Sequence, residues 1–207
     1  MIQYNLYIGE AVYLLAIAVW AKKRRYPLSW FFLAAICGLY VQLLLAEAVF
    51  PLVWPGDSFF CLSSDSFSLD FVRTYSARQA AENFIMTLPL GAVLSFLLNM
   101  GKRRRLIATV MMAASVELVQ LACQLLQIGF HSFDVKDVIL NAAGGMAGYG
   151  LFQIFCRLVN RLSLRISLRP YDGRGFFPLL VQTARNCAAG RKSLEGIAGN
   201  NKKIARK

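Results

Sequence analysis

The chain has 207 residues, of which 57% are hydrophobic, 13% aromatic and only 16% charged. A water-soluble domain of this length cannot bury so large an apolar share, so the composition argues against a soluble fold. Secreted disulfide scaffolds and cytosolic α/β enzymes are therefore excluded. So are β-barrels, whose strands are about ten residues long and alternate apolar with polar residues. Most of the net charge of +12 comes from residues after position 160.

The apolar residues form five blocks, each long enough for a helix to cross about 30 Å of hydrocarbon. In chain order they are residues 4–21, 28–50, 80–100, 106–128 and 138–159. The first block has no basic residue before it and no small-residue cleavage site after it, so we interpret it as a retained anchor. The sequence predicts an all-α integral membrane protein, a bundle of about five transmembrane helices.

Basic residues lie mainly on one side of these blocks. Clusters follow the first and third blocks at residues 22–25 and 102–105, and residues 160–207 hold eleven more. The opposite side holds only Arg73, Arg78 and Lys136. The positive-inside rule therefore predicts an N-terminus outside and a basic C-terminal tail in the cytoplasm. Such a tail favours contact with membrane lipids, and because no nucleic-acid motif accompanies it we expect no nucleic-acid partner.

Polar residues inside the predicted spans are candidates for function, because ionisable groups are costly in hydrocarbon. The block 106–128 carries Glu117, Gln120, Gln124 and Gln127. Their spacing places them on one face of a helix, with Glu117 near the middle of the bilayer and the glutamines toward the outer surface. The sequence therefore predicts a wet or paired face on this helix.

The last block begins with a matching stripe, formed by Asp134, Asp137, Asn141, Gly144 and Gly148. Small residues four apart let another helix approach closely, so we expect this stripe to contact the helix of block 106–128. Glu117 and Asn141 would then meet. An aspartate at a helix N-terminus can also serve only as a cap, and this alternative stays open for Asp134 and Asp137.

The third block has a defined start and an internal break. A Ser-x-x-Gln pattern beginning at Ser76 predicts a capping box at the outer surface. Glu82 and Asn83 follow about one turn inside the membrane. Pro89 interrupts the helix, because it cannot donate a hydrogen bond to the carbonyl of Ile85, and that carbonyl then needs another partner.

Three of these segments resemble the VanZ-like membrane proteins. Residues 82–91 resemble the family's Asn-x-x-x-Phe-x-Pro-x-Gly segment, and residues 117–120 resemble its Glu-x-x-Gln. Residues 133–145 are similar to its Asp-x-x-Asp-x-x-x-Asn-x-x-Gly-Gly run, in matching order, and His131 stands where many members have an arginine. The resemblance implies a multi-pass protein of the bacterial cell membrane. The resemblance also implies membership of a group named for reduced susceptibility to glycopeptide antibiotics, chiefly teicoplanin.

The resemblance and the charge pattern divide the chain into three parts. Residues 1–75 hold two N-terminal spans and an outer loop, residues 76–160 a three-helix VanZ-like core, and residues 161–207 the basic cytoplasmic tail. The five cysteines are scattered among these parts, so no disulfide framework or zinc site is predicted.

Carboxyl and amide groups from three blocks are expected to converge in an outward-facing polar pocket. The candidate ligand-binding residues are Glu82, Asn83, Glu117, Gln120, Gln124, His131, Asp134, Asp137 and Asn141. Amides both donate and accept hydrogen bonds, so this pocket suits a lipid headgroup, a lipid-linked cell-wall precursor or a lipoglycopeptide. Binding of such a ligand is the first functional hypothesis.

Two other functional hypotheses stay open. Paired carboxylates could act as general acid and base in an enzyme that modifies a membrane lipid or precursor. A proton-coupled transporter or flippase is the third hypothesis, because Glu10 and Glu117 lie within apolar blocks. The chain has one histidine and no Ser-His-Asp arrangement, which argues against zinc and serine hydrolysis. No cofactor is predicted, although the carboxylates could hold a divalent cation.

Overall fold

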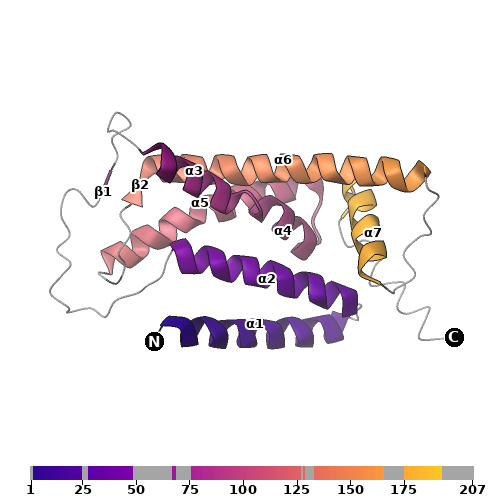
Figure 1. Ribbon diagram of the computed structural model, residues 1–207, viewed down its shortest axis with the longest axis horizontal. Coiled ribbons are helices and arrows are strands. Elements are labelled where there is room, and N and C mark those ends of the chain that lie inside the picture. The colour runs from indigo at the N-terminus through magenta and orange to yellow at the C-terminus, as the bar shows by residue number, and fades with distance from the viewer. Residues whose placement is uncertain are drawn as a thin grey trace.

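The computed structural model describes residues 2–24, 28–48, 67–68, 76–126, 128, 133–165 and 175–192. In these residues it contains seven α-helices and one pair of short parallel strands (Figure 1). The helices are α1 (Ile2–Arg24), α2 (Leu28–Ala48), α3 (Ala77–Thr87), α4 (Leu90–Leu97), α5 (Lys102–Leu125), α6 (Val135–Arg165) and α7 (Phe176–Ala188). The strands are β1 (Phe67–Ser68) and β2 (Phe133–Asp134). The predicted all-α class is confirmed.

Four helical segments are long and apolar enough to cross a membrane, within the part of the chain that the structure describes. They are Leu28–Ala48, Ala77–Leu97, Lys102–Leu125 and Val135–Leu164. They correspond to the second to fifth predicted blocks, so four of the five predicted blocks form candidate membrane-spanning helices. α1 is a helix of 23 residues that packs along α2. Its passage through the membrane, and the orientation that depends on it, stay predictions.

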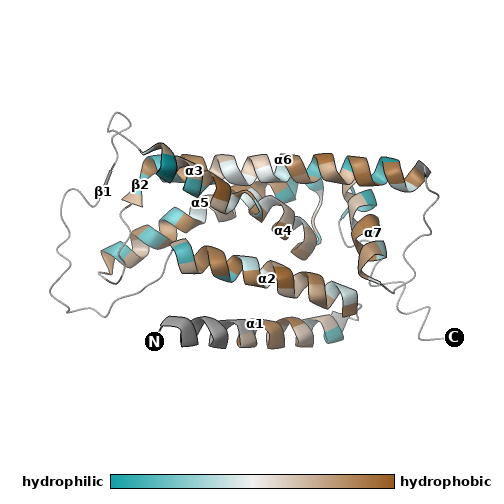
Figure 2. Ribbon diagram, viewed as in Figure 1, coloured by the Kyte–Doolittle hydropathy of each residue, from teal (hydrophilic) through white to brown (hydrophobic). Residues whose placement is uncertain are grey.

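The outer faces of the spans are apolar. Phe32, Ile36 and Leu43 of α2 and Met111 and Leu118 of α5 are large hydrophobic side chains that stay exposed. Figure 2 shows hydrophilic residues gathered toward the two ends of the bundle, with apolar residues along the helices between them. Soluble monomers rarely expose contiguous apolar surface on this scale, whereas a surface that faces lipid is apolar.

The third span is two helices, α3 and α4, joined at Pro89. Pro89 has no N–H to donate to the carbonyl of Ile85. That carbonyl accepts a hydrogen bond from the Leu88 N–H at 3.3 Å instead. The hydroxyl of Thr87, in the same turn, donates to the main-chain oxygen of Asn141 in α6 at 2.9 Å. The predicted break is therefore confirmed, and groups of the protein itself satisfy the backbone around it.

Ser76 occupies the N-cap position of α3, as predicted, but its side chain makes no capping hydrogen bond. The predicted capping box is therefore wrong. The first turn is closed instead by the backbone, where the Ala80 N–H donates to the Ser76 carbonyl at 3.0 Å.

Within the predicted stripe of α6, Asn141 meets α5 as expected, but Gly144 and Gly148 pack against α3 and the break that follows it. A Cβ atom at Gly144 would lie 2.2 Å from a main-chain oxygen of α3, and one at Gly148 would lie 1.6 Å from the Leu88 carbonyl oxygen. Gly145, which follows Gly144, faces α5 instead, and a Cβ atom there would lie 3.0 Å from the Cβ of Ala113. Because α6 contacts both neighbours, it needs small residues on two adjacent faces.

The last helix, α7, folds back onto the bundle and packs against α6 and α2. Leu179 and Cys187 of α7 are buried. Arg185 donates from Nε to the Ser163 hydroxyl of α6 at 2.8 Å, and Arg105, buried at the start of α5, donates to the Cys187 sulfur at 2.7 Å. Part of the predicted basic tail is thus a packed helix of the fold.

Candidate functional site

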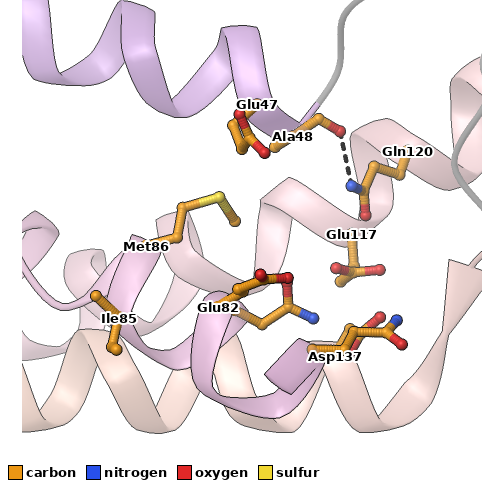
Figure 3. A pocket seen from close by; sticks show the side chains of 10 residues that line it. Glu47, Ala48, Glu82, Ile85, Met86, Glu117, Gln120 and Asp137 are labelled. Atoms are coloured by element: carbon orange, nitrogen blue, oxygen red, sulfur yellow. Dashed lines mark hydrogen bonds between the residues drawn. The ribbon is translucent and has the colours of Figure 1, made fainter. Parts of the chain in front are cut away.

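A polar pocket of about 480 Å³ lies at the end of the bundle where α2 ends and where α3 and α6 begin (Figure 3). It is lined by Glu47, Ala48, Gln79, Glu82, Asn83, Ile85, Met86, Glu117, Gln120 and Asp137. Each of the four candidate spans contributes one carboxyl group to this lining. These groups are Glu47 from α2, Glu82 from α3, Glu117 from α5 and Asp137 from α6.

Behind the pocket wall, Asn141 connects three helices. Its side-chain Nδ2 donates to Glu117 Oε1 at 3.0 Å, which confirms the predicted meeting of these two residues. Its main-chain oxygen accepts the hydrogen bond from Thr87 of α3. Asn141 has no exposed surface and Glu117 has 1% of its surface exposed. Asn141 therefore holds the Glu117 carboxyl in place without lining the pocket itself.

Two carboxyl oxygens at the pocket have no hydrogen-bond partner among the described residues: Oε2 of Glu117 and Oδ1 of Asp137. Asp137 is also buried, with 5% of its surface exposed. No lysine, arginine or histidine lines the described wall of the pocket. Buried acceptor oxygens without donors are energetically costly, and a hydrogen-bond donor or a positive charge would satisfy them.

Arg78, which precedes the pocket residue Gln79 in the sequence, is already paired. Arg78 donates from Nε to the carboxyl of Glu82 at 2.7 Å, one helical turn along α3. Both side chains of this ion pair are exposed, with 87% and 59% of their surfaces open, so water screens the attraction. The pair lies at the rim, and the two buried carboxyls deeper in the pocket keep no basic neighbour in its described lining.

The remaining predicted site residues take structural positions around the pocket. Gln120 lines it and also donates to the Ala48 carbonyl at 2.6 Å, which closes the C-terminus of α2 (Figure 3). Gln124 does not line it, and its side-chain oxygen accepts the N–H of Phe133 at 3.3 Å. Asp134 accepts the Lys136 N–H at 2.8 Å and so caps the start of α6. His131 lies outside the described residues.

Sequence reasoning missed part of the pocket. Glu47 is not among the predicted site residues, although a carboxyl at the end of an apolar block was the available signal. Gln79 was noted only for its capping pattern. Ile85 and Met86 give the pocket an apolar side that no polar pattern could reveal.

Within the described ranges, no group of three or more His, Cys, Asp or Glu side chains is placed so that it could hold a metal ion. The four carboxyls of the pocket are thus spread around its wall and are not gathered on one point.

The part of the chain that holds the pocket matches a known protein family. Residues 37–156 match the family described as VanZ/LLP1. The matched segment runs from the middle of α2 into α6, contains every residue that lines the pocket, and leaves out α1 and α7. No curated protein and no solved structure matches the chain. The match covers more than half of the sequence, and the chain is a multi-pass membrane protein that belongs to the VanZ/LLP1 family.

Proposed function

We propose that this protein binds the polar, positively charged headgroup of a lipid-linked ligand in the pocket between its four candidate spans. The observation that carries the proposal is the pair of buried oxygens without partners, Glu117 Oε2 and Asp137 Oδ1, in a described lining with four carboxyls and no basic residue. An ammonium group would satisfy such oxygens, and hydroxyl or amide groups of a sugar or peptide would bond to the side-chain amides.

The apolar side of the pocket favours a ligand that also has a hydrocarbon tail. Ile85 and Met86 line the pocket, and Ile85 has 64% of its surface exposed. A headgroup in the pocket could therefore continue into an acyl chain that lies along α3 in the surrounding lipid. A membrane lipid, a lipid-linked cell-wall precursor and a lipoglycopeptide such as teicoplanin all have this form.

The charge distribution supports a pocket that opens to the outer face of the cell membrane. The pocket lies where α5 ends and α6 begins, whereas the basic residues 102–105 and Arg157 to Arg165 lie at the opposite ends of these helices. By the positive-inside rule the basic ends are cytoplasmic. An outward pocket would meet glycopeptides and wall precursors directly, which is consistent with the antibiotic resistance that the family resemblance implies.

The proposal is tested by equilibrium binding to the purified protein in nanodiscs. The probes are a fluorescent lipid-linked wall precursor, teicoplanin, and its tail-free relative vancomycin. We expect Glu117→Gln combined with Asp137→Asn to weaken binding of the tailed ligands by about a hundredfold to ten-thousandfold, because each of the two lost charge-assisted hydrogen bonds is worth roughly 1.5–3 kcal/mol.

The matched control is Thr109→Val in α5, which removes a buried polar group outside the pocket without changing the side-chain shape. This variant should bind all three probes as the parent protein does. Tailed ligands that bind equally well to the parent and to the double variant would contradict the proposal. Cells that carry the double variant should also lose any teicoplanin tolerance that the parent protein confers.

The same two carboxyls favour one alternative, an enzyme that modifies a membrane lipid or wall precursor. A pair of buried carboxyls beside a pocket can act as general acid and base. Turnover of a purified lipid substrate, measured with and without Mg²⁺, would support this alternative if Glu117→Gln abolished turnover and left binding in place. Absence of turnover over a broad lipid panel would contradict this alternative.

A further inference from the structure

A second pocket, of about 580 Å³, lies at the N-terminal end of α5, and nothing in the proposed function uses it. Its lining comes from two segments that are far apart in the sequence. The lining residues are Gly101, Lys102, Arg103, Arg104, Gly190, Arg191 and Lys192. Five of these seven residues are basic and none is acidic.

The backbone after α7 forms a defined turn just before the basic residues Arg191 and Lys192. Gly190 adopts φ +72°, and the chain turns there with the Gly190 N–H donating to the Cys187 carbonyl at 3.1 Å and the Arg191 N–H to the Asn186 carbonyl at 2.8 Å. This is a Schellman turn, which needs a residue that tolerates positive φ. Buried Arg105 then donates from Nη2 to the Arg191 carbonyl at 3.1 Å, which ties the turn to α5.

The start of α5 adds main-chain donors to the same pocket. Gly101 is the N-cap of the helix and has no side chain with which to cap it, so the N–H groups of the first turn are not capped by a side chain. A helix N-terminus carries a partial positive charge and favours anions. The two described segments around the pocket, residues 98–116 and 175–192, contain no acidic residue that could neutralise the five cations.

We propose that this pocket binds a phosphate group, and that the phosphate is the headgroup of an anionic phospholipid. Five like charges held together repel one another, so an anion that enters between them is stabilised by all of them. The pocket lies at the end of a candidate span, where the helix reaches the headgroup level of a bilayer. Basic pockets at the ends of membrane helices favour anionic lipid headgroups. A soluble phosphate ester offers the same chemistry, and the experiment distinguishes the two sources.

The full-length protein is purified in nanodiscs of phosphatidylcholine, and its affinity is measured for short-chain phosphatidylglycerol, short-chain phosphatidylcholine and inorganic phosphate. We expect phosphatidylglycerol to bind in preference to phosphatidylcholine. Arg104→Gln combined with Arg191→Gln should weaken phosphatidylglycerol binding by about thirtyfold, because each basic residue near an anionic headgroup contributes roughly 1 kcal/mol.

Two further variants separate a defined pocket from general surface charge. Arg157→Gln combined with Arg161→Gln removes the same charge from exposed positions on α6 outside the pocket, and should change affinity by less than about threefold. Gly190→Ala keeps every charge but opposes the positive φ, and should weaken binding by about fivefold to thirtyfold. Thermal unfolding in detergent establishes that each variant is folded.

Equal losses in the pocket and control pairs, or full affinity in Gly190→Ala, would overturn the proposal, as would absence of binding to both phosphatidylglycerol and phosphate. Binding of phosphate without preference for the lipid would support the pocket and assign it to a soluble phosphate ester.

Discussion

Asn141 is the residue through which α3, α5 and α6 are connected. It donates to Glu117 in α5, accepts from Thr87 in α3, and has no exposed surface. The sequence could predict the Glu117–Asn141 contact, because both residues lie on polar stripes with helical spacing. It could not predict the bond to Thr87, because the break at Pro89 determines where that hydroxyl lies.

We expect Asn141→Leu to lower the free energy of unfolding by about 1–3 kcal/mol, since it leaves the buried Glu117 carboxyl without its donor. The double variant Asn141→Leu with Glu117→Leu should be more stable than Asn141→Leu alone, because both polar partners are gone. Thermal unfolding of the purified protein in detergent measures both. If the stability lost in Asn141→Leu and the stability lost in Glu117→Leu simply add in the double variant, the two residues do not interact as described.

At the scale of the helices, the close packing of α6 on α3 depends on glycine. Gly148 lies against the Leu88 carbonyl at the break between α3 and α4, where a Cβ would be only 1.6 Å from the oxygen. The glycine spacing predicted a close helix contact, but both neighbouring helices were compatible with it. The choice of α3 depends on the three-dimensional path of the chain after Pro89, which local periodicity does not contain.

Gly148→Ala should lower the free energy of unfolding by about 3 kcal/mol or more, because the methyl group collides with main-chain atoms that cannot rotate away. Gly150→Ala, two residues further along the same helix, is the matched control, since a Cβ there meets nothing within 4 Å. It should leave stability unchanged or raise it by up to about 1 kcal/mol. Similar losses in both variants, measured by thermal unfolding, would mean that the close approach at Gly148 is wrong.

For the molecule as a whole, the sequence predicted the spans well and the arrangement between them poorly. Apolar block length was sufficient for four spans, and the proline was sufficient for the break between α3 and α4. The docking of α7 was missed, because a short amphipathic helix with basic flanks has the same composition as a surface segment. Burial of Arg105 beneath α7 was missed for the same reason: four consecutive basic residues at 102–105 gave no signal that one faces inward.

The orientation of the whole bundle in the membrane can be tested by labelling its two ends. A membrane-impermeant thiol reagent applied to intact cells should label Gln79→Cys at the pocket and should not label Arg103→Cys at the opposite end of the bundle. The parent chain, with its five native cysteines, gives the background signal. Opening the cells should expose Arg103→Cys to the reagent. Labelling of Arg103→Cys alone in intact cells would reverse the predicted orientation.

One carboxyl from each of four helices has a mechanical consequence for the bundle. Arg78 offsets the charge of Glu82. When ionised, Glu47, Glu117 and Asp137 push the ends of their helices apart, and no basic residue lines the described walls of the pocket. A bound cation reverses the sign of that force and cross-links the four helices. Binding of the cation and stability of the folded bundle are then thermodynamically linked, so a bound cation would raise the melting temperature.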